Sequence, residues 1–146
     1  MKLALWVPVL LLLSACAQEA SETEQIRAQI IAMERFAEQG ERGQFMRQVS
    51  DDFSGQNAQL DRSALNMLLL AQLNVNQRVF AQTGPVRIQM ESASPARNAT
   101  AEFDALLTGG RGWLPEQGNL FRFTTRWRKD EDEWILVAAD WQTVTL

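Results

Sequence analysis

The stretch Leu120–Thr145, LFRFTTRWRKDEDEWILVAADWQTVT, carries the clearest structural pattern in the 146-residue chain. Its two apolar segments, Leu120–Arg128 and Trp134–Thr145, are rich in the aromatic and β-branched residues that favour strands. The charged residues around Asp130–Asp132 are typical of an exposed turn. We therefore predict that the C-terminus forms a hairpin of two antiparallel strands.

The pairing of these two strands decides which side chains face the interior. If Lys129 pairs with Glu133, one face gathers the aromatic and aliphatic side chains, and the other places Arg122 opposite Asp140 and Arg126 opposite Leu136. The apolar face then holds Phe121, Phe123, Trp127, Ile135, Val137, Ala139 and Trp141. A slip by one residue would move Asp140 among the aromatic rings, because side chains alternate strictly along a strand. We favour the first pairing, which buries more apolar surface and brings opposite charges together.

Further strands precede this hairpin. Apolar and polar residues alternate with a period of two in Val86–Met90 and in Ala99–Leu107, as in strands with one buried face. In the second of these, Phe103 shares a face with alanines, whereas Glu102 and Asp104 point the other way. The predicted strands are Gln77–Gln82, Val86–Met90 and Ala99–Leu107, with a turn at Ser92–Pro95 and a glycine-rich loop at Gly109–Gly118.

The first half of the chain has the spacing of helices. A capping box, with Ser21 as the N-cap and Glu24 as the side chain that reaches back, begins an amphipathic helix that ends near Gly40. Its apolar stripe is Ile26, Ile30, Met33 and Ala37. A short second helix is predicted over Gln44–Val49. Asp61 caps a third helix, whose apolar face holds Leu65, Leu68, Leu69 and Leu73.

Helices followed by an antiparallel sheet indicate an α+β fold, in which the helices pack on one face of a curved sheet. This order, the step Asp51-Asp52-Phe53 and the closing strand from Trp134 to Trp141 resemble the nuclear transport factor 2-like superfamily over residues 22–146. The resemblance implies a cone-shaped, cystatin-like roll with a pocket between the helices and the sheet. Ketosteroid isomerases, polyketide cyclases, dehydratases and many non-enzymatic modules share this fold, so the fold alone does not define the function.

The N-terminus has the pattern of an exported lipoprotein. Lys2 precedes the apolar run Leu3–Leu13, which is too short to span a membrane but suits a signal peptide. The run ends in Leu13-Ser14-Ala15-Cys16, which resembles the lipobox of bacterial lipoproteins. The resemblance implies that residues 1–15 are a signal peptide and that Cys16 carries the lipid.

An anchored domain would lie close to the membrane. Residues 16–21 form the lipidated cysteine and a short tether, which at about 3.5 Å per extended residue keeps the domain near the bilayer. The resemblance to lipoproteins also implies the periplasmic face of a bacterial membrane. It favours the outer membrane, because Ala17 is not an aspartate.

The composition excludes several kinds of chemistry. The chain contains no His and no Tyr, and Cys16 is its one cysteine, so imidazole catalysis, thiolate zinc sites and disulfides within the chain are excluded. Without residues 1–15, whose one charge is Lys2, 13 basic and 18 acidic residues remain, a net charge of −5. Such a chain lacks the basic face that nucleic-acid binding needs. We expect no metal, no cofactor and no nucleic acid.

A pocket in the predicted cone would be lined by aromatic residues of the sheet. The candidates are Phe103, Phe121, Phe123, Trp127 and Trp141. Enzymes with this fold hold an acid–base group inside the cone, whereas the favoured strand pairing leaves the cone without an ionisable side chain. We therefore predict a non-catalytic domain that binds a small apolar molecule or an envelope protein. The alternatives are a cyclase-, isomerase- or dehydratase-like enzyme that uses Asp140 or Asp104, and a homodimer formed through the outer sheet face.

Overall fold

The structure, a computed structural model, describes residues 21–76, 78–110 and 117–145. The predicted signal peptide, the lipobox and Cys16 lie outside the described residues, as does the tether up to residue 20. In chain order the elements are α1 (Ser21–Glu38), α2 (Arg42–Arg47), β1 (Val49–Gly55), β2 (Leu60–Asp61), α3 (Arg62–Val75), β3 (Arg78–Thr83), β4 (Arg87–Met90), β5 (Asn98–Gly110), β6 (Gln117–Asp130) and β7 (Glu133–Thr143).

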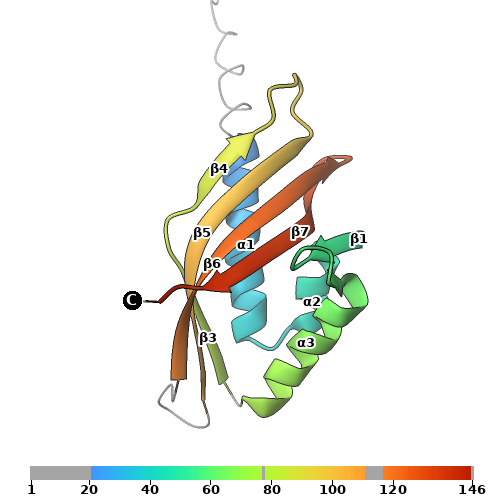
Figure 1. Cartoon of the computed structure of the whole chain (residues 1–146). Helices are drawn as coiled ribbons and strands as arrows, with labels where there is room; N and C mark the ends of the chain where they lie inside the picture. The colour runs from blue at the N-terminus through green and yellow to red at the C-terminus, as the bar shows by residue number, and fades with distance from the viewer. Residues whose placement is uncertain (1–20, 77, 111–116, 146) are drawn as a thin grey trace, which may run out of the picture.

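The helices cover one face of a curved sheet. Figure 1 shows α1 crossing this face, with α2 and α3 beside it next to β1. The strand order is β2-β1-β7-β6-β5-β3, and β4 pairs with β5 as well. All pairs are antiparallel except β1 and β7, which run parallel. The predicted α+β class is confirmed, but the sheet is mixed rather than purely antiparallel.

Strand β1 takes the place of the predicted end of the second helix and the loop after it. Helix α2 ends at Arg47, and Val49 begins a strand that buries Val49, Phe53 and Gly55. The two adjacent aspartates, Asp51 and Asp52, interrupt the alternation of apolar and polar residues by which a strand is recognised in the sequence. The partner strand β7 lies far along the chain, so local spacing gives no sign of the pairing.

The predicted strands in the rest of the sheet form, with shifted ends. Strand β5 continues to Gly110, and β6 begins at Gln117. Gly109, Gly110, Gln117 and Gly118, which we predicted to lie in a loop, therefore belong to strands; residues 111–116 of that predicted loop lie outside the described residues. Asp61 caps α3 as predicted, since its side chain accepts a hydrogen bond from the Ala64 N–H at 2.8 Å.

The hairpin of β6 and β7 is paired differently from the prediction at its turn. Lys129 pairs with Trp134, so the predicted pairing of Lys129 is wrong by one residue. The shift turns Trp134 and Leu136 into the core, where they are 2% and 5% exposed. Ile135 and Val137, which we predicted to face inward, alternate with them and face the opposite side of the sheet.

A bulge restores the predicted side-chain directions further along this hairpin. The register shifts by one residue between Arg126 and Trp127, and beyond it Phe123 pairs with Trp141. An extra residue on one strand reverses the alternation after it. Trp141 therefore shares the inner face with Phe123, while Asp140 faces away from it. The prediction for Trp141 and Asp140 is correct, although the pairing it was based on is not.

Helix α1 closes the free edge of the sheet along β3. The Glu34 carboxylate accepts a hydrogen bond from the Thr83 N–H at 2.9 Å, and the Glu38 carboxylate accepts one from the Ala81 N–H at 3.0 Å. Between β3 and β4, the Val86 carbonyl accepts a hydrogen bond from the Arg27 guanidinium at 2.9 Å. An exposed strand edge invites pairing with other chains. These contacts satisfy part of that edge within the molecule.

The first turn of α1 is attached to the β6–β7 turn. The Glu22 carboxylate accepts hydrogen bonds from Lys129 Nζ and, at 2.7 Å, from Trp134 Nε1. Helix α1 begins at Ser21, the first described residue, so the predicted N-cap stays a prediction; the Glu24 carboxylate lies 3.6 Å from Arg27 Nε. The predicted stop is correct, because Gly40 has a positive φ of 71° and follows the last helical turn.

The core lies between α1 and the middle of the sheet. Its most deeply buried large side chains are Ile26 and Trp127. The indole N–H of Trp127 and the hydroxyl of Thr125 are buried in this core. Trp127 Nε1–H donates to Thr125 Oγ1, which in turn donates to the Ala101 carbonyl, both at 2.9 Å. No buried side-chain nitrogen or oxygen of the described residues lacks a hydrogen-bond partner. The other core residues are Ile30, Met33, Met46, Val49, Phe53, Leu65, Ala99, Ala101, Ala105, Trp134, Leu136, Ala138 and Ala139.

Candidate functional site

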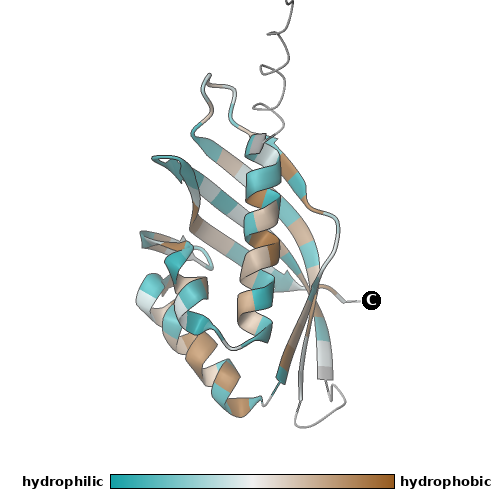
Figure 2. Cartoon of the chain, turned by 180° about the vertical axis from the view of Figure 1, so that it is seen from behind, coloured by the Kyte–Doolittle hydropathy of each residue, from teal (hydrophilic) through white to brown (hydrophobic). Residues whose placement is uncertain are grey.

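A cavity of about 610 Å³ lies between α1, α3 and the concave face of the sheet. Helix α3 packs against α2, β1 and β2, and it faces β5 and β6 across this space. Figure 2, which views the molecule from behind, shows hydrophobic residues along much of α3. A volume of this size falls within the range of about 300–1,000 Å³ that is typical of small-molecule sites.

The sheet supplies an aromatic wall to the cavity. The rings of Phe103 and Phe123 stack with their centroids 5.3 Å apart. Phe121 and Trp141 flank Phe123 at 6.3 Å and 6.0 Å. Trp127 lines the deep end. All five residues that we predicted as pocket candidates therefore lie along one cavity; that a ligand binds to them stays a prediction.

The helices supply an aliphatic wall opposite these rings. Ile30 and Met33 come from α1, and the others are Leu65, Leu68, Leu69 and Val75 from α3. Leu68 and Val75 are 38% and 60% exposed. The cavity thus opens toward the C-terminal end of α3, which lies near the β3 end of the sheet in Figure 1.

One carboxylate lines the cavity, contrary to our prediction of a cone without an ionisable group. Glu34 of α1 is half-buried and contributes to the wall between α1 and β3. It follows Ile30 by four residues and therefore lies on the same side of the helix. The helical spacing contained this signal, but we assigned only the apolar positions to the inner face.

Neutral polar residues surround the opening of the cavity. They are Gln72 and Asn76 of α3 and its C-terminal cap, with Thr108 and Asn119 of the facing strands. Asn76 lies directly over Gly109, where a β-carbon would come within 2.5 Å of its Oδ1. A side chain at position 109 would displace the Asn76 amide from this place. The sequence offered no sign of this group, because its members come from distant segments.

The two carboxylates of the predicted enzymatic alternative lie outside the cavity. Asp104 forms a two-point ion pair with Arg122 at 2.8 Å and 3.1 Å. This guanidinium holds the pKa of Asp104 below its usual value. Asp140, the partner that we predicted for Arg122, instead accepts the Asn57 N–H at 2.8 Å. Neither residue lines the cavity.

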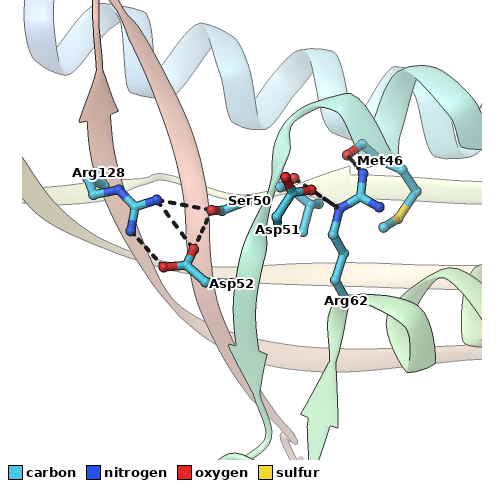
Figure 3. A network of polar contacts seen from close by, with 7 residues as sticks. Met46, Ser50, Asp51, Asp52, Arg62 and Arg128 are labelled. Atoms are coloured by element: carbon cyan, nitrogen blue, oxygen red, sulfur yellow. Dashed lines mark hydrogen bonds and ion pairs between the residues drawn. The ribbon is translucent and has the colours of Figure 1, made fainter.

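A second group of polar contacts ties β1 to β6 across β7, as Figure 3 shows. Arg128 donates to the Asp52 carboxylate at 3.1 Å and to Ser50 Oγ at 3.1 Å. The Asp52 carboxylate also accepts a hydrogen bond from the Ser50 hydroxyl, and the bonds from Arg128 and Ser50 lower the pKa of Asp52 to about 2. On the other side of β1, Asp51 lies 3.7 Å from Arg62, which also donates to a backbone carbonyl of α2. The contacts satisfy one another and lie away from the cavity, so we assign them a structural role.

Two searches of the described residues gave negative results. No helix among them is long and apolar enough to cross a membrane. No group of three or more Asp, Glu or Cys side chains among them is arranged to hold a metal ion.

Comparison with known proteins identifies the fold. No protein-family model and no curated protein sequence matches the chain. Among solved structures, a putative scytalone dehydratase from Novosphingobium aromaticivorans has a TM-score of 0.73 at 9% identity, over 86% of both chains. A nuclear transport factor 2-like protein with a cystatin-like fold from the same organism has a TM-score of 0.70 at 15% identity, over 86% of this chain and 83% of the other.

A third similar structure is a type 2 hexachlorocyclohexane dehydrochlorinase. It has a TM-score of 0.68 at 10% identity, over 86% of this chain and 87% of the other. The chain therefore has the nuclear transport factor 2-like, cystatin-like fold, as the resemblance in its sequence implied. Identities this low establish the fold and leave the activity open.

Proposed function

We propose that the protein is a binding module that holds a small apolar molecule in the cavity between its helices and its sheet. The observation that carries this proposal is the cavity itself, with an aromatic wall facing an aliphatic one. A closely packed interior normally leaves few voids larger than a water molecule. A space of about 610 Å³ lined by aromatic and aliphatic side chains is therefore better explained as a ligand site than as a packing defect.

Binding is favoured over catalysis because of the positions of the carboxylates. An enzyme of the isomerase or dehydratase type needs an acid–base group within reach of its substrate. Asp104 is held by Arg122 on the outer face, and Asp140 faces away from the rings. Among the described residues that line the cavity, Glu34 is the one carboxylate, and its Oε2 is engaged by the Thr83 N–H.

The experiment is a titration of the full chain with N-phenyl-1-naphthylamine, an uncharged probe that fluoresces in apolar surroundings. We expect saturable binding at one site. Ala81 lines the cavity, so Ala81→Phe should weaken binding at least about tenfold by filling it. Gln82 is exposed on the other side of the same strand, so Gln82→Phe is the matched control and should bind like the unchanged chain. Equal binding by both variants would contradict the proposal.

We further propose that the module is held at the periplasmic face of a bacterial membrane, most simply the outer membrane, through acylated Cys16. The support is the sequence pattern of residues 1–16. Two or more acyl chains anchor a protein stably, at about 0.8 kcal/mol for each buried CH₂. Labelled fatty acid should be incorporated into the chain and should be lost in Cys16→Ser. Incorporation that survives this substitution would refute the anchor.

A further inference from the structure

We infer that the cavity selects apolar molecules whose polar end is uncharged and excludes molecules that carry a carboxylate, sulfonate or phosphate. This inference rests on the proposed binding function and adds the charge of the ligand to it. It follows from the charges on the cavity wall, the positions of the cations and the chemistry of the opening.

The wall of the cavity carries a negative charge and no described positive one. Glu34 is the one ionisable side chain among the described residues that line it. Its Oε2 accepts the Thr83 N–H, which fixes the carboxylate against the wall. Among the described residues, no lysine or arginine forms an ion pair with it. An anionic ligand would meet a like charge beside an apolar wall.

Two cations of the neighbouring strands are engaged by carboxylates of β5. Arg122 of β6 pairs with Asp104, and Arg87 of β4 lies 3.5 Å from the Glu102 carboxylate. Neither arginine lines the cavity. A buried anion needs a counter-charge or several hydrogen bonds to offset its lost hydration. The described wall supplies no such counter-charge.

The opening is suited to an uncharged polar group. The side-chain amides of Gln72, Asn76 and Asn119 provide both donors and acceptors. Asn76 is already oriented, because its Nδ2 donates to the Gln72 carbonyl at 3.0 Å and its Oδ1 lies over Gly109. Hydroxyl, amide or carbonyl ends can exchange hydrogen bonds with these groups while the apolar body lies against the rings.

The test is a competition between two matched molecules. The full chain is loaded with N-phenyl-1-naphthylamine, and decan-1-ol or decanoate is added at pH 8 below its aggregation concentration. Both carry ten carbons and differ in the charge of the polar end. We expect decan-1-ol to displace the probe and decanoate to need at least about a tenfold higher concentration, because charge repulsion and desolvation both oppose it.

Two isosteric variants of α1 identify the source of the selectivity. Glu34→Gln keeps an oxygen for the Thr83 N–H but removes the charge, so the gap between the two competitors should narrow severalfold. Glu38→Gln is the control, since Glu38 accepts the Ala81 N–H in the same way but is exposed and outside the cavity wall. It should leave the gap unchanged.

The outcomes distinguish a failure of the charge selectivity from a failure of the binding function. Equal displacement by decanoate and decan-1-ol in the unchanged chain would overturn the inference and leave the binding function standing. If Glu34→Gln and Glu38→Gln reduced the difference between the two competitors equally, the inference would also be overturned, because the selectivity would then come from general surface charge. No saturable probe binding at all would overturn the binding function and the inference together. If Glu34→Gln fails to fold, the comparison in the unchanged chain still decides.

Discussion

Replacing Thr125 by valine should destabilise the protein measurably, because Thr125 completes a buried chain of hydrogen bonds. Its hydroxyl donates to the Ala101 carbonyl and accepts from Trp127 Nε1–H, both at 2.9 Å. Thr125 and Trp127 are 4% and 1% exposed, so water does not replace either contact. Valine has nearly the same shape and removes only the hydroxyl.

The expected size follows from the group that is left without a partner. A buried donor that loses its acceptor costs about 1–3 kcal/mol. The indole N–H is in that position in Thr125→Val, so we expect a loss of about 2 kcal/mol in the free energy of unfolding. Thr125→Ser keeps the hydroxyl and removes one methyl group, which should cost about 1 kcal/mol.

The assay is urea unfolding of the full chain followed by far-ultraviolet circular dichroism, which does not depend on the tryptophan signal. A lower midpoint at unchanged slope reports a change in stability. In a Trp127→Phe background no indole N–H exists, so Thr125→Val should cost about 1 kcal/mol less than in the unchanged chain. An equal cost in both backgrounds, or none in either, would refute the proposed role of the N–H.

Three other predictions concern the same fold. Arg128 lowers the pKa of Asp52 to about 2, so the contribution of Asp52 to stability is present above about pH 4 and disappears as the pH falls to 2. The unfolding midpoint of Asp52→Asn should therefore depend less on pH in that window than the midpoint of the unchanged chain. The difference in the free energy of unfolding should be under about 1 kcal/mol, because the pair is solvent-exposed. In Gly55→Ala the new β-carbon would come within 2.8 Å of a backbone oxygen of β7, so we expect the free energy of unfolding to fall by about 1–3 kcal/mol. In Gly43→Ala, the control in α2, the new β-carbon meets nothing within 4 Å. The same urea assay should show no change in its free energy of unfolding or a rise of up to about 1 kcal/mol. Asp61→Ala removes the N-cap of α3 and should lower the free energy of unfolding by about 1 kcal/mol; unchanged stability would mean that the end of this helix is held by its neighbours alone.

The hairpin of β6 and β7 shows what the spacing of residues along one strand can and cannot predict. The alternation of Phe121, Phe123 and Trp127 correctly predicts an aromatic face on β6, because a strand alternates whatever its partner. The same reasoning fails on β7 near the turn, where Trp134 and Leu136 are buried in place of the expected residues. A bulge is a property of two strands together, and neither strand reveals it alone.

In the candidate site, too, some features could be predicted from the sequence and others could not. Its aromatic wall was predictable from the strands, and Glu34 was within reach of the helical pattern through Ile30. The meeting of Asn76 with Gly109 was not predictable, because it depends on the pairing of β3 with β5, in which Val79 lies opposite Gly109. The engagement of Asp104 by Arg122 likewise depended on which strand lies beside which.

By itself, the sequence determined which segments are helices and most of those that are strands, since these depend on residue types and spacing within a few positions. It also determined that histidine, tyrosine and disulfide chemistry are absent from the chain. Only the tertiary structure decided that β1 joins the sheet in parallel, that a bulge sets the inner face of β7, and that a cavity remains under α3. Those features depend on how distant segments meet, because the free energy of packing belongs to pairs of elements and not to either element alone.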